Sequence, residues 1–216
     1  MNRFLPFSLQ GQELLVTASR TIYWEAEKFL VLSDLHLGKS GHFRKSGIAI
    51  PQNIFKEDMQ RLMDEIQFFK PKDLIIVGDL FHSSLNLELD LFARWRRDIP
   101  HVGVQLIKGN HDILKADWYQ QNGIEVHPRK LSVSNFSFVH DIADCADEGY
   151  CFSGHIHPGI RIRGLGRQSV QLPCFYFGKS HAVLPAFGKF TGTYPVRPED
   201  GDSVFALVEN SVMQLQ

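Results

Sequence analysis

The sequence is poor in cysteine, in long apolar runs and in net charge. Its three cysteines, Cys145, Cys151 and Cys174, form no CxxC pair, which argues against a thiolate zinc site. No apolar run approaches the roughly 18 residues of a membrane-spanning helix, and no signal-peptide-like core is present at the start. We therefore expect reduced thiols, a cytoplasmic location and no membrane partner. The formal net charge of −1 gives no global sign of nucleic-acid binding, although a local basic face is compatible with it.

The sequence also lacks repeats, low-complexity segments and linkers, which predicts one domain over residues 1–216. A chain of this length with 44% hydrophobic residues can bury a sizeable core. Histidine is abundant instead: there are ten, about twice the ordinary share. Their positions along the chain are therefore informative about function.

Continuous apolar runs at 29–33, 74–77 and 104–107 predict strands that are buried on both faces. They alternate with two predicted helices, 53–69 and 86–97, whose apolar residues recur at three-four spacing. This order is typical of a parallel sheet whose functional site lies at the carboxyl ends of the strands. Two further short strands are predicted at 14–18 and 21–24.

The predicted helices each have one apolar stripe. The stripe residues are Phe55, Met59, Leu62, Ile66 and Phe69 in the first helix, and Leu87, Leu91 and Trp95 in the second. Asn53 is the expected N-cap of the first helix.

After about residue 124, short alternating segments predict a mainly antiparallel set of strands, beginning with EVH at 125–127 and including 136–139 and 150–154. The fold class that we expect is α/β (α+β): a four-layer αββα sandwich, with two packed, mixed β-sheets flanked by helices.

Polar side chains of the kinds that bind metal ions follow the predicted strands. They are Asp34, His36, Asp79, Asn110, His111, Asp112, His140, His155 and His157. In an extended chain, residues two apart point to the same side, so the D-x-H and H-x-H pairs can each present two ligands to one cavity. Nitrogen and oxygen ligands without sulfur favour Mn²⁺, Fe²⁺ or Zn²⁺. The set is too large for one ion and predicts two divalent metal ions.

Five motifs, SDLH, GDL, GNHD, VH and GHIH, occur in this order between residues 33 and 157. Together they resemble the signature of the calcineurin-like metallophosphoesterases. The resemblance implies that Asp34, His36 and His157 hold one metal ion and that Asn110, His140 and His155 hold the other. It also implies that Asp79 bridges both ions.

The same resemblance implies catalytic roles for His111 and Asp112. His111 would protonate the leaving group or stabilise the phosphoryl oxygens, and Asp112 would orient His111. The nucleophile would be a metal-bridged hydroxide that attacks phosphorus in line.

A narrower resemblance lies in HLGKSGHFRKSGIAIP at 36–51 and GDLFHS at 78–83. These segments are similar to the bacterial ligase-associated DNA-damage-response metallophosphoesterases, which are grouped with a helicase, an exonuclease-like protein and a DNA ligase. This implies a Mn²⁺-dependent phosphodiesterase or endonuclease acting on DNA in repair, with those three proteins as partners.

Basic residues near the predicted ligands are candidates for substrate binding, or else ordinary solvated loop residues. Lys39, His42, Arg44 and Lys45 follow the first ligand pair, and Arg161, Arg163 and Arg167 follow the last pair. His82 and His181 are left open between a role in the cleft and a structural one.

Two other functions remain open at this point. The first is hydrolysis of a small nucleotide phosphodiester or of a nucleotide-sugar-lipid pyrophosphate, because the fold does not fix the substrate. The second is a non-catalytic metal-binding scaffold for DNA-repair partners, which would have no use for His111.

Overall fold

The computed structural model describes residues 2–39, 54–82, 87–145, 149–164, 168–189 and 191–216. The predicted N-cap Asn53 lies outside these ranges, as do four of the candidate substrate contacts: His42, Arg44, Lys45 and Arg167.

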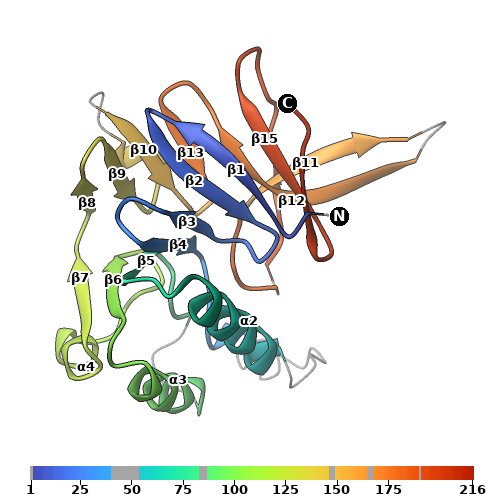
Figure 1. The fold of residues 1–216 in the computed structure, drawn as a ribbon. Coiled ribbons are helices and arrows are strands. Elements are labelled where there is room, and N and C mark those ends of the chain that lie inside the picture. The colour runs from blue at the N-terminus through green and yellow to red at the C-terminus, as the bar shows by residue number, and fades with distance from the viewer. Residues whose placement is uncertain (1, 40–53, 83–86, 146–148, 165–167, 190) are drawn as a thin grey trace.

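The first sheet contains seven described strands in the order β1-β2-β3-β4-β5-β6-β7 (Figure 1). They are β1 (Phe4–Leu9), β2 (Gln12–Thr17), β3 (Ile22–Trp24), β4 (Phe29–Ser33), β5 (Asp73–Val77), β6 (Gly103–Ile107) and β7 (Ile124–His127). Pairing is antiparallel from β1 to β4 and parallel from β4 to β7. The three predicted parallel strands are therefore confirmed as β4, β5 and β6, whereas β1 was not predicted.

The segment EVH was expected among the later, mainly antiparallel strands, and this expectation is wrong. Its residues lie in β7, which pairs in parallel with β6. The cause is α4 (Ala116–Gln121), a short helix that the sequence reasoning did not identify. Because α4 carries the chain back along the sheet, β6, α4 and β7 form one more βαβ step.

The second sheet follows the path β14-β11-β12-β13-β10-β9-β8, with β15 and β16 added beside β12. Its strands are β8 (Lys130–Val133), β9 (Phe136–Val139), β10 (Tyr150–Ser153), β11 (Pro158–Arg163), β12 (Ser169–Phe177), β13 (His181–Val183), β14 (Tyr194–Pro195), β15 (Ser203–Val208) and β16 (Ser211–Gln214). The sheet is mixed, because β9, β10 and β13 pair in parallel while β11, β12 and β15 pair antiparallel.

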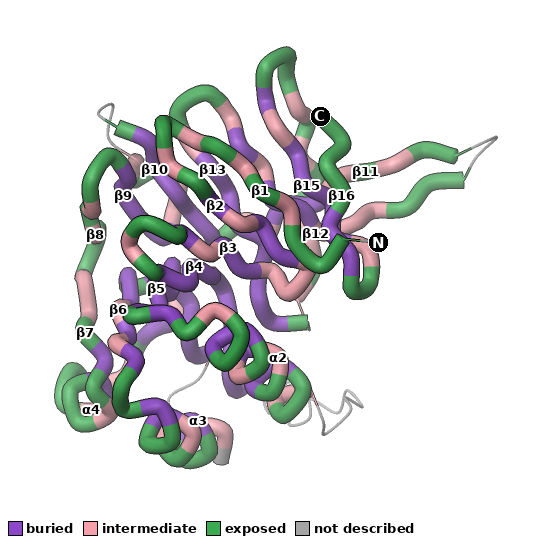
Figure 2. The backbone as a smooth tube through the Cα atoms, viewed as in Figure 1, coloured by how far each residue is buried: buried purple, intermediate pink, exposed green. Residues whose placement is uncertain are grey.

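Side-chain alternation in the central strands builds two separate cores. In β4, Phe29 and Val31 join the cluster between the two sheets, whereas Leu30 and Leu32 join the cluster under the helices. The helical layer consists of α2 (Ile54–Phe69), α3 (Leu87–Asp98) and α4. Figure 2 shows β4 and β5 as buried along their whole length. The predicted packing of two mixed sheets with flanking helices is confirmed.

The apolar stripe of α2 is confirmed, since Met59, Leu62 and Ile66 are buried in the core under the helices. The stripe predicted for α3 is wrong at Leu91, which is 37% exposed, whereas Trp95 packs against the core as predicted. Leu89 and Phe92 are buried in its place. The face of α3 that is buried is the one that neighbouring elements cover. Leu89 and Phe92, three residues apart, lie on that face. Among the described residues, no helix is long and apolar enough to cross a bilayer.

The expectation of three reduced thiols is wrong for two of them. Cys145 and Cys151 form a disulfide, with their Cα atoms 6.0 Å apart. The pairing could not be predicted from the sequence because it depends on the path of the folded chain. Cys145 follows a 3-10 turn at Ile142–Asp144, which brings it back beside β10. Cys174 is free, and burial raises its pKa to about 12, so its thiol is unreactive near neutral pH.

Replacing both Cys145 and Cys151 with serine is expected to lower the free energy of unfolding by about 2 kcal/mol, because the bond closes a short loop. Urea denaturation measures this change. A reductant should lower the stability of the wild type by the same amount and leave the double variant unaffected. Equal wild-type stability with and without reductant would show that the bond does not form in solution.

Candidate metal centre

Five of the seven candidate ligands that follow the strands have left-handed backbone. Positive φ values are found at Asp34 (51°), His36 (49°), Asp79 (49°), His155 (69°) and His157 (51°). The sequence reasoning assumed extended chain for the D-x-H and H-x-H pairs, and that assumption is wrong. Each such residue costs about 1–3 kcal/mol and persists only where its surroundings hold it. This concentration of strained residues is itself a mark of a functional site.

The first group of candidate ligands combines Asp34, His36 and His157. The Asp34 Oδ1 atom lies 3.4 Å from His157 Nε2 and 3.9 Å from His36 Nε2, and the two imidazole nitrogens are 3.2 Å apart. The other carboxylate oxygen, Oδ2, accepts a hydrogen bond from the backbone of His155 at 3.0 Å. Asp34 Oδ1 is buried and has no hydrogen-bond partner among the described residues. An oxygen in that position is suited to a cation.

The second group combines Asp79, His140 and His155, with Asn110 beside it. The His140 Nε2 atom is 3.5 Å from Asp79 Oδ2, 3.1 Å from His155 Nδ1 and 3.1 Å from Asn110 Oδ1. The other ring nitrogen of His140 lies 3.3 Å from the Val77 carbonyl. That contact fixes the ring so that Nε2 faces the group.

Asp79 lies between the two groups. Its Oδ2 atom is 3.8 Å from His36 Nε2 in the first group and 3.5 Å from His140 Nε2 in the second. Burial would raise the pKa of this carboxyl, but the hydrogen bond and charge of His140 and the backbone N–H of His111 lower it to about 2. Asp79 is therefore a carboxylate at neutral pH.

Two histidines show how strongly the site shapes protonation. Burial lowers the pKa of His36 to about 3, although Asp34 and Asp79 act in the opposite direction. Burial would also lower the pKa of His140, but the hydrogen bond and negative charge of Asp79 raise it to about 9. His36 is thus neutral at pH 7, which is the form that binds metal ions, whereas His140 would have to release its ring proton to bind one.

A glycine before Asn110 gives Asp79 its space. A Cβ atom on Gly109 would lie 2.2 Å from Asp79 Oδ1 and 2.4 Å from the Asp79 backbone nitrogen. Gly78 and Gly154 are equally confined, by His140 and Asp34 respectively.

We expect Gly109→Ala to lower the free energy of unfolding by about 1–3 kcal/mol, because the added methyl group overpacks the site. It should also reduce phosphodiester hydrolysis, because Asp79 must move. Urea denaturation and a chromogenic diester assay measure the two effects. Gly192→Ala is the matched control, since nothing lies within 4 Å of its added Cβ. Wild-type behaviour of Gly109→Ala in both assays would contradict the prediction.

The loop 109–112 holds His111 beside this centre. The His111 backbone N–H donates to Asp79 Oδ1 at 2.9 Å, and the His111 ring lies 5.5 Å from the His36 ring. Asp112 is fully buried and accepts hydrogen bonds from the backbone of Gly109 (2.9 Å) and Phe81 (3.2 Å). Burial raises the pKa of Asp112 to about 6. Among the described hydrogen bonds, Asp112 therefore orients the loop that carries His111 and not the imidazole itself.

Two further side chains reach the centre. The His82 ring lies 4.6 Å from the His111 ring and 5.6 Å from the His36 ring, so this histidine lies beside the candidate metal centre. Asp141 was missed: its Oδ2 atom is 3.9 Å from His155 Nε2, on the side of the ring away from His140. The only sign of Asp141 in the sequence was its position directly after His140. His181, in contrast, begins β13 and packs against Tyr176, 5.7 Å between rings.

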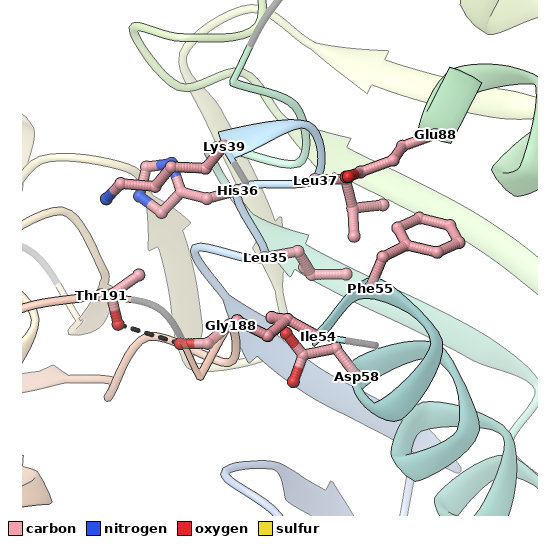
Figure 3. A pocket seen from close by; sticks show the side chains of 10 residues that line it. All are labelled: Leu35, His36, Leu37, Lys39, Ile54, Phe55, Asp58, Glu88, Gly188 and Thr191. Atoms are coloured by element: carbon pink, nitrogen blue, oxygen red, sulfur yellow. Dashed lines mark hydrogen bonds between the residues drawn. The ribbon is translucent and has the colours of Figure 1, made fainter. Parts of the chain in front are cut away.

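Lys39 lies at the edge of the centre. It lines a pocket together with His36, Phe55, Glu88 and Thr191, and Figure 3 shows these side chains around it. Burial lowers the pKa of Lys39, while Asp34 and Asp79 raise it. Among the candidate substrate contacts at 39–45, Lys39 is the one that the structure describes. Its ammonium group lies next to a group of candidate metal ligands.

A segment from the far end of the chain holds Asp34 in place. The Phe187 N–H donates to the Ser33 carbonyl at 2.8 Å, and the Gly188 N–H donates to the Asp34 carbonyl at 3.1 Å. The Ser33 hydroxyl donates in turn to the Pro185 carbonyl at 3.2 Å. Residues 185–188 therefore act as a brace for the strand end that carries the first ligand pair.

The brace is itself held from its other side by two arginines. Arg20 donates to the carbonyls of Ala186 (2.9 Å) and Gly188 (3.1 Å). Arg61 of α2 donates to the Phe187 carbonyl and stacks on the Phe187 ring, 4.2 Å from its centroid. Burial lowers the pKa of Arg20 to about 10, so it stays charged at neutral pH.

Comparison with known proteins agrees with this geometry. Residues 27–178 match the family model of the calcineurin-like phosphoesterases. The crystal structure of the Pseudomonas putida nuclease MPE superposes with a TM-score of 0.84 and 27% sequence identity, covering 98% of this chain and 100% of that one. The E. coli phosphoesterase Yfce is more distant, with a TM-score of 0.45, 14% identity, and coverage of 87% and 97%. No match was found among curated proteins.

The fold and the two ligand groups define a metal-dependent phosphoesterase, a hydrolase whose family implies two divalent metal ions. Since the family model matches well over half of its length, the chain belongs to the calcineurin-like phosphoesterase family.

Proposed function

We propose that this protein hydrolyses phosphodiester bonds in DNA, as a nuclease that acts in DNA repair. The observation that carries the proposal is the pairing of two ligand groups through Asp79, with His111 beside them. Two-metal centres of this type cleave phosphate esters. The similarity to the Pseudomonas putida nuclease over the whole chain supports a nucleic acid as the substrate class.

The donor atoms fit two divalent ions. In the proposal, Asp34, His36 and His157 would hold one ion, Asn110, His140 and His155 would hold the other, and Asp79 would serve both. The unpartnered Asp34 Oδ1 and the convergence of imidazole nitrogens support this assignment. A purely nitrogen and oxygen donor set without sulfur supports Mn²⁺, with Fe²⁺ and Zn²⁺ as the alternatives. When bound, such ions lower the pKa of a coordinated water and offset the charge on phosphate oxygens.

The remaining residues act on the substrate. The His111 ring supplies a proton to the departing oxygen, and the Asp112 carboxylate keeps its loop in place through the Gly109 and Phe81 backbone. The Lys39 ammonium group attracts a phosphate next to the scissile one. His42, Arg44 and Lys45, which lie outside the described residues, are proposed from the sequence as further phosphate contacts.

Nicking of supercoiled DNA in the presence of Mn²⁺ is the direct test. The wild-type protein is expected to convert supercoiled DNA to the open circle, and EDTA should stop the reaction. Parallel assays with bis-p-nitrophenyl phosphate and p-nitrophenyl phosphate define the reaction type. Faster hydrolysis of the monoester would overturn the diesterase assignment, whereas diester hydrolysis without nicking would favour a small nucleotide diester as the substrate.

A further inference from the structure

A hairpin projects from the protein next to the candidate metal centre. It is formed by β11 and the first half of β12, residues 158–163 and 169–173. We call it the arm. Figure 1 shows its far end extending beyond the other strands of the second sheet. It begins at Pro158, directly after His157, and the Tyr194 N–H donates to the His157 carbonyl at 2.8 Å. The root of the arm is thus fixed to a candidate metal ligand.

The arm makes little contribution to the core. Among the described residues, neither hydrophobic cluster includes any of its aliphatic side chains: Ile160, Ile162, Val170 and Leu172. Val170 is 51% exposed. Ordering a projecting hairpin costs conformational entropy, and here core burial offsets little of that cost. A contribution to the stability of the fold therefore does not account for the arm.

The strand register separates the side chains of the arm into two faces. Arg161 pairs with Gln171 and Arg163 pairs with Ser169, so these four residues form a polar face. Both arginines are exposed, and neither has an ion pair with a described residue. The Arg161 guanidinium has one long contact, 3.4 Å to Gln171 Oε1. The described residues of the arm contain no carboxylate that would neutralise this face.

We propose that the polar face of the arm binds the sugar-phosphate backbone of the nucleic acid on one side of the cleaved bond. The inference rests on the proposed nuclease function and adds a substrate-binding surface to it. Arg161 and Arg163 lie four and six residues past His157, which is about 13 and 20 Å of extended strand. At 3.4 Å per nucleotide along one strand of a duplex, this equals roughly four to six nucleotides. Arginine is well suited to such contacts because its guanidinium can bind a phosphate with two N–H groups.

The double variant Arg161→Ala with Arg163→Ala tests the surface. Its kcat/KM for DNA is expected to fall about tenfold, and the slope of log(kcat/KM) against log[salt] should become about 1.4–1.8 shallower, because two phosphate contacts are lost. Bis-p-nitrophenyl phosphate is too short to reach the arm from the metal centre, so its hydrolysis reports on the centre alone. We expect that rate to stay at the wild-type value. Lysine at both positions should restore most of the DNA activity.

Arg129→Ala with Lys130→Ala is the matched control, because it removes two exposed charges near β8, at the opposite edge of the sheet path from the arm. It should leave DNA cleavage unchanged. An equal loss on DNA and on the small diester, or no loss on either, overturns the arm proposal. A wild-type protein that hydrolyses the small diester but cuts no DNA overturns the proposed function itself, and the arm proposal with it.

Substrate length gives an independent readout. In a series of oligonucleotides extended on one side of the cut, kcat/KM of the wild type should rise until about four to six nucleotides are present and then level off. The arginine-to-alanine variant should show a flat profile over that range. A rise that is the same in both proteins would overturn the proposal.

Discussion

Asparagine in place of Asp79 is expected to reduce kcat/KM for bis-p-nitrophenyl phosphate by about 10³-fold or more, because in the proposed site both ions would lose a shared charged ligand. The substitution preserves shape, and the amide oxygen can still accept the hydrogen bond from the His111 backbone. The loss should therefore come from the missing charge next to His36 and His140 and not from unfolding. Metal content by mass spectrometry should fall below two ions per chain.

Asp90→Asn is the matched control, since it makes the same chemical change at an exposed position on α3. It should keep both the ions and the rate. A variant at Asp79 that retained two tightly bound ions and the wild-type rate would show that this carboxylate does not join the two ligand groups.

His111→Ala is expected to lower kcat by about 10²–10⁴-fold while the metal content stays at the wild-type level. The reason is its place: the ring lies beside His36 and His82, yet it belongs to neither ligand group. Metal analysis and steady-state kinetics on the same preparation separate the two effects. Loss of an ion from this variant would mean that His111 is a ligand.

The leaving group distinguishes the two roles that His111 could have. A general acid matters most when the departing oxygen is strongly basic, as in DNA, and least for p-nitrophenolate. We expect the rate loss to be larger on DNA than on the chromogenic diester. Equal losses would instead mean that His111 stabilises the phosphoryl oxygens. His101→Ala, at an exposed histidine, should leave both rates unchanged.

The central part of the fold was predictable because its signals are local. The buried strands β4, β5 and β6 are short apolar runs, and each is followed at once by a polar group, so both the sheet and the position of the site could be predicted. The structure places Asp34 in one group of candidate ligands and Asp79 and His140 in the neighbouring group. Leu35, between the first candidate ligand pair, is buried in the core under the helices.

What could not be predicted depends on distant partners. The ligands leave their strands in left-handed backbone that only the assembled site can hold, as at Asp34 and His157. The disulfide and Asp141 depend on how the chain returns after β9. The exposed Leu91 depends on which face of α3 its neighbours cover.

The brace at 185–188 has a consequence for the order in which the protein acquires its activity during synthesis. Every proposed metal ligand lies between Asp34 and His157, so the ribosome delivers all of them before it delivers Phe187 and Gly188. The backbone carbonyl of Asp34 accepts a hydrogen bond from Gly188, and the brace is in turn held by Arg20 and Arg61, which are synthesised before it. A nascent chain that ends before residue 185 thus contains every proposed ligand but lacks the brace that holds Asp34. Competence to bind metal should therefore arise late and abruptly, when the last quarter of the chain folds back onto the first.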